Sequence, residues 1–235
     1  MDYRQILSYV PTVIESSSRG ERSFAIFSRI SKPPVMAWAF VNVYKRCKNF
    51  EILKKAYPKF VKNEEFWINK RCFKGLFHYD CDIKDENYYK HSAFETGWDN
   101  SVRFDNGAMN LWSIDLNCYM LLFYQALMFM ANELSLINDY NIWKFKFTVL
   151  EKKINSILWD EQNLVYCDYD FVNNKFTNVI TPASFMPLFV KIAPKERAFL
   201  LFEIAKDRNN FYPNMPTVSF DNPNFDQNDY WRGPV

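Results

Sequence analysis

Histidine is scarce in this chain: only His78 and His91 occur in 235 residues. Imidazole is a common metal ligand in proteins, so the sequence argues against a histidine-based metal site, and we expect neither a metal nor another cofactor. The chain also lacks a block of basic residues, and its net charge is only +2. Nucleic acid binding requires a concentrated positive face, so nucleic acid is not an expected partner.

Further absences bear on where in the cell the protein is found. The five cysteines include no Cys-x-x-Cys pair, and an odd count without metal-site spacing predicts reduced, mostly buried thiols in a cytoplasmic protein. Residues 1–6 lack the basic start of a signal peptide. No run of about 18 apolar residues is present, so neither a membrane-spanning segment nor a membrane partner is expected. The cysteines are Cys47, Cys72, Cys81, Cys118 and Cys167.

Aromatic residues, in contrast, make up 19% of the chain. A large hydrophobic core can absorb many of them, but carbohydrate sites also use Trp, Tyr and Phe, so this excess permits either explanation. The length slightly favours one domain over two and is sufficient for a substantial core.

Apolar periodicity predicts helices that follow one another in pairs. The first helix follows Pro33 and Pro34 and is apolar on all sides, so we expect it to be well buried. Pro58 should kink or split the second helix, and Ser113 is the expected N-cap of the third. The predicted helices cover residues 35–46, 51–70, 113–134, 142–158, 183–190 and 194–206.

Short extended segments and long irregular segments separate these pairs. Residues 75–80 are expected to be extended, and residues 164–178 to form a small β-hairpin that turns at Asn173 and Asn174. Residues 81–111 and 209–235 have no clear periodicity. A loop as long as the first is usually functional or disordered, and its aromatic content argues against disorder.

Repeated antiparallel helical hairpins can stack side by side and close into a ring, as in the (α/α)6 barrel. Three pairs with an N-terminal helix would supply a little over half of such a ring. Periodicity alone is equally compatible with an ordinary irregular helical domain.

Residues 95–105 read ETGWDNSVRFD and combine carboxylates, aromatic rings and an arginine in one loop. These are the groups that bind and cleave sugars, so Asp99 is a candidate general acid. The alternative is an Asx-turn, because Asp-Asn-Ser is turn chemistry in any protein.

This stretch resembles the E-S-G-W-D-N-S-x-R-[FW]-D signature of glycoside hydrolase family 63 and the related mannosylglycerate-hydrolase-like enzymes, and more distantly trehalase. The resemblance covers roughly residues 24–235, with Lys32 in place of the family's Gln and Thr96 in place of its Ser. Four further motifs agree in order: SKPPV at 31–35, DLN at 115–117, LWDE at 158–161 and YWRGPV at 230–235.

The resemblance implies one partial catalytic domain over residues 1–235: an all-α fold of helical hairpins from an (α/α)6 toroid, with a small β-hairpin. It also implies inverting cleavage of an α-linked glucoside or mannoside, with Asp99 as the general acid. Inversion needs two carboxyl groups about 6.5–9.5 Å apart, and the family's second carboxylate is a glutamate beyond the Trp-Arg-Gly-Pro motif. The acid must stay protonated, which Trp98 could favour by excluding water, and Glu95 or Asp105 by like charge.

The same resemblance supplies candidate substrate-binding residues. Aromatic side chains suit the apolar face of a pyranose ring. Arg103 could bind sugar hydroxyls or form a structural salt bridge with Asp105. The candidates are Trp98, Asn100, Arg103, Phe104, Asp105, Trp231, Arg232 and Gly233.

The expected partner is therefore a carbohydrate. Because the chain ends before the second carboxylate and before a ring can close, we expect a piece of a longer enzyme that is inactive alone and self-associates through uncovered helix faces. The alternatives are a non-catalytic carbohydrate-binding or decayed glycosidase, and an unrelated helical module with a coincidental motif.

Overall fold

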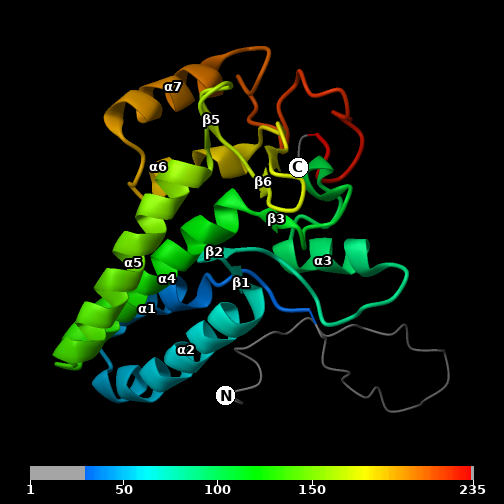
Figure 1. The fold of residues 1–235 in the computed structure, drawn as a ribbon. Coiled ribbons are helices and arrows are strands. Elements are labelled where there is room, and N and C mark those ends of the chain that lie inside the picture. Colours follow the sequence, from blue (N-terminus) through cyan, green and yellow to red (C-terminus); the bar gives the residue numbers. More distant parts are fainter. Residues whose placement is uncertain (1–29, 234–235) are drawn as a thin grey trace, which may run out of the picture.

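Helices dominate the part of the chain that the computed structural model describes, residues 30–233 (Figure 1). The expectation for residues 1–6, and the last two residues of the YWRGPV motif, lie outside this range. The helices are α1 (Met36–Cys47), α2 (Phe50–Arg71), α3 (Tyr88–Thr96), α4 (Ile114–Glu133), α5 (Ile137–Ile157), α6 (Met186–Phe189) and α7 (Lys195–Lys206), with short 3-10 turns η2 (Val102–Phe104) and η3 (Pro182–Phe185).

All strands are two residues long and pair antiparallel in three small sheets: β1 with β2, β3 with β6 and β7, and β4 with β5. The predicted hairpin is confirmed as β6 and β7. Its expected first arm, from residue 164 to residue 170, is not one strand but two: β5 pairs with β4, whereas β6 pairs with β3 and β7. The strands are β1 (Cys72–Phe73), β2 (Leu76–Phe77), β3 (Leu111–Trp112), β4 (Trp159–Asp160), β5 (Val165–Tyr166), β6 (Tyr169–Asp170) and β7 (Lys175–Phe176).

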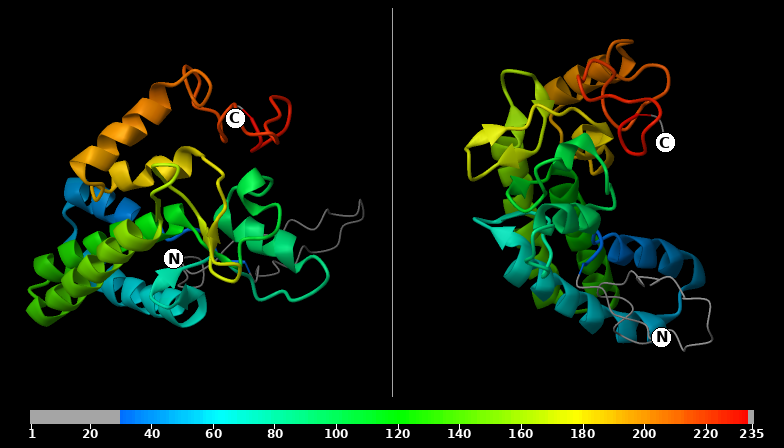
Figure 2. Two further views of the ribbon diagram at one scale, coloured as in Figure 1. Left: turned by 45° about the horizontal axis from the view of Figure 1, so that its top comes forward. Right: turned by 90° about the vertical axis from the view of Figure 1, so that its right-hand side faces the viewer.

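Helix α4 is the centre of the core, with α1, α2 and α5 packed around it (Figure 2). Its residues are apolar on nearly every side, which is why it is buried on nearly every side. It is also the one described helix long and apolar enough to cross a membrane, against our expectation of no such run, but 78% of its apolar window is buried inside the fold. It therefore serves here as a core helix.

Helix α1 is less buried than predicted. Ala37, Val41 and Tyr44 face the core, whereas Met36 and Val43 are 52% and 63% exposed. The sequence pattern could not reveal that only one side of this helix is covered. Helix α2 runs without a break through Pro58, so the predicted split does not occur.

Helix boundaries differ from the sequence expectations at several places. Helix α3 lies inside the stretch 81–111 that we expected to be irregular. Helix α5 begins at Ile137 rather than 142, because the chain reverses earlier, at Ser135 in the left-handed region (φ 58°). Ser113 precedes α4 as predicted but does not cap it, since its hydroxyl group donates to the carbonyl of Leu111.

Residues 207–233 form no helix or strand, as predicted, yet they are well anchored. Their backbone hydrogen bonds include Thr217 N–H to Gly233 O at 2.9 Å and Ser219 N–H to Ile180 O at 3.0 Å. The last described residues lie beside the loop that follows α3 (Figure 1).

The cysteines are free thiols, and three of the five are buried: Cys81, Cys118 and Cys167. This confirms the burial that we expected for most of them. The cytoplasmic location inferred from them stays a prediction.

Candidate active site

Asp99 lies in the turn that follows α3. Gly97 ends the helix in the left-handed conformation (φ 79°), and the hydroxyl of Thr96 accepts a 2.8 Å hydrogen bond from the N–H of Trp98. The turn closes through Ser101 N–H to Trp98 O at 3.0 Å. Asp99 is exposed, and its carboxyl group has no hydrogen-bond partner among residues 30–233. The Asx-turn alternative is therefore not the arrangement found, because the backbone forms this turn without the Asp99 side chain.

Glu95 anchors the end of α3 inside the protein. It is fully buried, pairs with Arg71 at 2.9 Å, and accepts the N–H of Asp80 at 2.6 Å. Burial lowers the pKa of Arg71, but the hydrogen bonds and charge of Glu95 outweigh this and raise it above its ordinary value. Because an arginine neutralises Glu95, it does not supply the like charge expected beside Asp99.

Lys32, which replaces a glutamine of the family, touches the same helix. Its ammonium group donates to the carbonyl of Phe94 in the last turn of α3, at 2.6 Å. A cation at this position is favourable because helix C-termini carry partial negative charge. In this structure Lys32 therefore makes a contact within the protein.

Arg103 is buried between two carboxylates, Asp115 and Asp168, each at 2.9 Å. Burial lowers its pKa, but these two charges raise it well above the ordinary value. The predicted salt bridge from Arg103 to Asp105 is wrong. Only 1% of the Arg103 side chain is exposed, so the arginine holds the loop in place and does not present its donors to a ligand.

The acid motif at residues 95–105 and the Trp-Arg-Gly-Pro motif near the end of the chain meet in space. Trp98 and Trp231 stack with ring centroids 4.9 Å apart and an interplanar angle of 18°. Asn100 donates to the carboxylate of Asp229 and to the carbonyl of Tyr230, each at 3.1 Å. One face of each indole is therefore covered by the other ring, and the Arg103 guanidinium also lies over the Trp98 ring, 5.1 Å from its centroid.

Gly233 has a structural reason to be glycine. A Cβ atom at this position would lie 2.3 Å from the backbone oxygen of Asp226. This close approach lets the tail fold back, where Arg232 forms an ion pair with Asp105. That arginine in turn neutralises Asp105, the second group expected to give Asp99 a like-charged neighbour.

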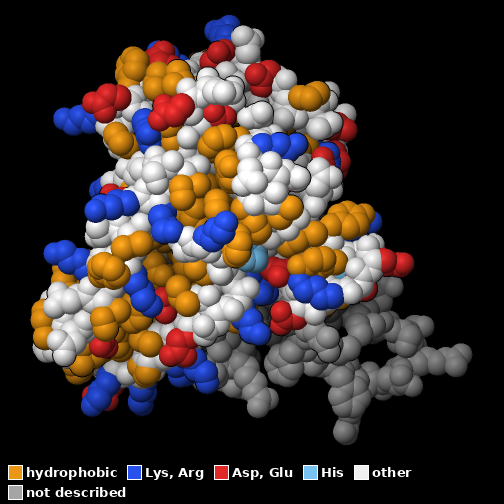
Figure 3. Space-filling view, viewed as in Figure 1, with side chains coloured by type: hydrophobic (Ala, Val, Ile, Leu, Met, Phe, Trp, Pro, Cys, Tyr) orange, Lys and Arg blue, Asp and Glu red, His pale blue; other side chains and the backbone are white. Residues whose placement is uncertain are grey.

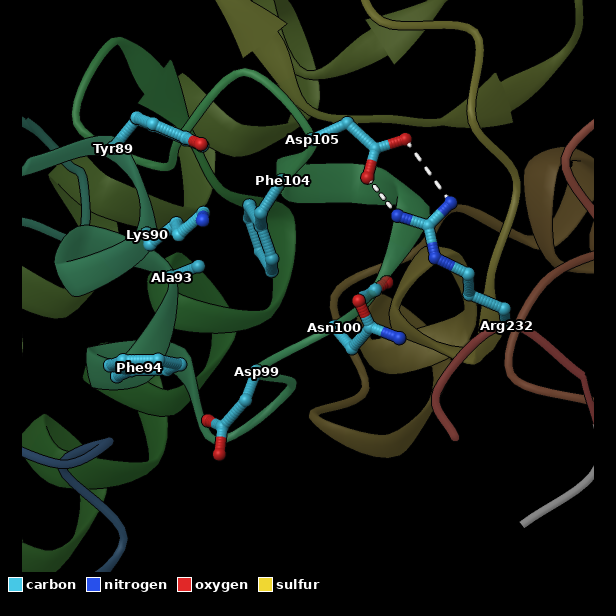
Figure 4. A pocket seen from close by; sticks show the side chains of 10 residues that line it. Tyr89, Lys90, Ala93, Phe94, Asp99, Asn100, Phe104, Asp105 and Arg232 are labelled. Carbon is cyan, nitrogen blue, oxygen red and sulfur yellow. Dashed lines mark hydrogen bonds and ion pairs between the residues drawn. The ribbon is translucent and has the colours of Figure 1, made fainter. Parts of the chain in front are cut away.

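A cavity of about 380 Å³ lies between α3, the acid loop (residues 97–105) and the tail (residues 207–233) (Figure 4). Five of the predicted residues line it: Asp99, Asn100, Phe104, Asp105 and Arg232. In Figure 4 the carboxyl group of Asp99 points away from the Asp105–Arg232 pair. The other lining residues are Tyr89, Lys90, Ala93, Phe94 and Ser101.

The other predicted residues, Trp98, Arg103, Trp231 and Gly233, are not among the residues that line this cavity. Periodicity does not reveal α3 as a helix, so Tyr89, Lys90 and Phe94 are absent from the predicted site residues. The glycine after Thr96, a typical helix C-terminus, was the signal that could have revealed it.

Comparisons with known proteins identify the family of this chain and the architecture that it shares. A family model for the mannosylglycerate hydrolase MGH1-like glycoside hydrolase domain matches residues 7–235. The structure of the family 63 mannosylglycerate hydrolase from Thermus thermophilus in complex with glucose superposes with a TM-score of 0.74 at 21% identity, covering 94% of this chain and 63% of that one. Neutral trehalase from Saccharomyces cerevisiae gives a TM-score of 0.72 at 16% identity, over 88% of this chain and 48% of that one.

The trehalase of Bombyx mori is 25% identical over an alignment length of 213, and the match covers 70% of this chain and 36% of that protein. The chain spans less than two fifths of the length of the first curated relatives that it matches. The structural likeness confirms the predicted helical-hairpin architecture of the (α/α)6 glycosidases. From the extent of the family match, this chain belongs to the mannosylglycerate hydrolase MGH1-like glycoside hydrolase domain family.

Proposed function

We propose that this chain forms the acid-bearing part of an inverting glycoside hydrolase that cleaves an α-linked glucoside or mannoside, with Asp99 as the general acid. The observation that carries the proposal is the cavity in which Asp99 lies beside Asn100, Asp105 and Arg232. These residues come from two sequence motifs more than 120 positions apart, joined by the Asn100 and Arg232 contacts.

The proposed chemistry begins with proton transfer from Asp99 to the glycosidic oxygen of the leaving group. An inverting enzyme also needs a carboxylate that activates water on the opposite face of the sugar. The carboxylates nearest the acid loop are already engaged: Glu95 with Arg71, Asp105 with Arg232, and Asp229 with Asn100. We therefore place the general base outside residues 30–233.

Phe104, with Phe94 and Tyr89 of α3, would give the site its apolar wall. Phe104 lines the cavity directly, and the cation of Arg103 lies 4.7 Å from its ring centroid, on the buried side. Arg103 fixes this wall and does not bind the substrate.

The test is Asp99→Asn in the full-length protein. The amide has nearly the shape of the acid but cannot deliver a proton, so turnover of α-linked glucosides and mannosides should fall about 10²–10⁴-fold while sugar binding is retained. Glu86→Gln is the matched control, because Glu86 is an exposed carboxylate that precedes α3 and lies outside the cavity. An unchanged rate for Asp99→Asn would show that the acid is elsewhere.

The second candidate function is carbohydrate binding without catalysis. It is favoured by the exposed position of Asp99, whose carboxyl group has no hydrogen-bond partner among residues 30–233. Calorimetric titration with α-linked disaccharides separates the two functions. Binding by the full-length protein with no turnover on any α-glucoside or α-mannoside would support the non-catalytic alternative.

A further inference from the structure

The end of the helical bundle opposite the candidate site has an unusual surface. There the connection between α1 and α2 lies beside the connection between α4 and α5 (Figure 1). Tyr57 of α2 donates a 2.8 Å hydrogen bond to Asp139 at the start of α5, and Tyr44 donates to Glu133 at 3.2 Å. Helices α2 and α4 have 22 and 20 residues, so this end is about 30 Å from their other ends, which adjoin the candidate site.

Large apolar side chains are exposed at this end. They come from both connections, so they form one patch and are not scattered singly over the molecule. Exposed apolar residues that gather in one place mark a surface that contacts a partner or a membrane. The residues, with their exposed fractions, are Val43 (63%), Phe50 (49%), Ile52 (50%), Leu136 (40%) and Ile137 (65%).

Basic side chains surround these apolar residues. Five exposed ones lie within 11 positions of the chain: Lys45, Arg46, Lys48, Lys54 and Lys55. We call the apolar and basic residues together the far-end surface. Figure 3 shows hydrophobic side chains beside Lys and Arg side chains at the lower left, over the ends of the α2 and α5 helices.

Helices α1 and α2 are strongly basic as a pair: residues 36–71 have nine basic and three acidic residues, a net charge of +6. Of the basic residues, Lys70 and Arg71 lie at the other end of α2, near the candidate site. Three carboxylates belong to or adjoin the far-end surface. Glu51 is exposed between Phe50 and Ile52, whereas Glu133 and Asp139 each accept a hydrogen bond from a tyrosine. The five basic residues of the surface outnumber them.

We infer that the far-end surface binds the surface of an anionic lipid bilayer. The apolar side chains would enter the headgroup region, and the lysines and Arg46 would lie against lipid phosphates and carboxylates. Figure 1 shows that the ends of the helices project at this corner, a shape that fits a flat bilayer. A second copy of the chain would bring two positive surfaces together. This contact requires no membrane-spanning segment, and it leaves the candidate site facing water.

Vesicle flotation tests the inference with the purified full chain. Vesicles of phosphatidylcholine with 30% phosphatidylserine, taken as about the composition of an anionic leaflet, are compared with vesicles of phosphatidylcholine alone. We expect the chain to float with the anionic vesicles, to sink with the neutral ones, and to bind less as salt concentration rises. Aggregated protein sinks in this assay, so aggregation cannot imitate binding.

Two variants address the two parts of the surface. Lys54→Glu/Lys55→Glu should weaken binding to anionic vesicles about tenfold or more, because each basic residue near the bilayer contributes to attraction. Phe50→Ser/Ile137→Ser should weaken it about tenfold or more, through loss of apolar contact. The matched controls, Lys191→Glu/Lys195→Glu and Leu164→Ser/Val172→Ser, change exposed residues outside the far-end surface and should float like the unaltered chain.

The inference is wrong if the unaltered chain sinks with anionic vesicles, or if the far-end variants float as well as the controls. Equal flotation with neutral vesicles would also contradict it, because the basic residues would then have no role. Sedimentation of the chain without lipid tests the competing partner, which is a second copy of the chain. A dimer that the far-end variants convert to monomer, while vesicle binding is unchanged, would identify the surface as a contact between two copies.

Discussion

Arg103 is fixed by two carboxylates that come from distant parts of the chain. The structure pairs it with Asp115 and Asp168, and the second of these lies 65 positions along the chain. No local pattern reports such a partner, because the pairing arises only when β6 packs beside the start of α4.

This pairing predicts a large stability effect at Asp168. Asp168→Asn removes one of two charges that compensate the buried guanidinium, and it weakens the acceptor for the N–H of Ile114 at 2.8 Å. We expect the free energy of unfolding to fall by about 3–5 kcal/mol, measured by urea denaturation. Asp82→Asn is the control, since the Asp82 carboxylate is 59% exposed and lies 3.9 Å from Arg71. A loss below 1 kcal/mol (about the value of an exposed pair) would contradict this account of the pair.

His78 predicts a pH dependence of stability. Burial lowers its pKa below the ordinary value, although the hydrogen bond with the carbonyl of Tyr79 partly opposes this. The unfolded chain then binds a proton at higher pH than the folded chain, so stability is lost as pH falls below about 6.5. His78→Gln should lose less stability than the unaltered protein between pH 7.5 and pH 5, measured by thermal unfolding. If His91→Gln removes the pH dependence of stability instead, the histidine responsible is His91 and not His78.

At the scale of elements, periodicity predicted most of the helices but few of their ends. The apolar repeat located α4 within a residue, because this helix is buried on nearly every side and its pattern is strong. The same repeat missed α3, which is nine residues long and is held by polar contacts such as Glu95 with Arg71. It also overestimated the burial of α1, since a sequence does not say which neighbours cover a helix.

The end of α3 offers a test of how the acid loop is positioned. Gly97 has a φ of 79°, and a Cβ atom there would meet no atom within 4 Å, so backbone conformation alone opposes a side chain. Gly97→Ala should cost about 1–2 kcal/mol of unfolding free energy. Gly97→Asn should cost less, because asparagine tolerates the left-handed conformation better. Equal losses in the two variants, measured by denaturant unfolding, would mean that the loop adopts another backbone conformation.

For the whole molecule, sequence motifs predicted more of the candidate site than composition or periodicity did. The acid motif and the Trp-Arg-Gly-Pro motif pointed to one cavity, and the stacked Trp98 and Trp231 confirm that they meet. The sequence could not show that Glu95 and Asp105 are neutralised by Arg71 and Arg232, or that Asp99 is exposed. The first pair depends on how α3 packs against the end of α2. The second depends on where the tail folds back, which it does through backbone hydrogen bonds that carry no sequence signature.

The last prediction concerns association of the chain as a whole. Helix α7 exposes Phe199 and Phe202, which are 63% and 59% accessible and lie one turn apart, and Phe189 of α6 is 57% exposed nearby in the chain. Such a surface is unfavourable in water, so residues 1–235 should self-associate as their concentration rises. Sedimentation equilibrium should show a mass above 28.2 kDa at high concentration. Phe199→Ser/Phe202→Ser should shift the distribution toward monomer.

Val172→Ser is the control for this change, because Val172 is also exposed, at 57%, but lies singly in the turn between β6 and β7. It should leave the mass distribution unaltered, since a single exposed apolar side chain is common on protein surfaces. A monomer at every concentration would show that these phenylalanines are tolerated in water. An equal response to both changes would mean that association depends on general surface polarity and not on the α7 face.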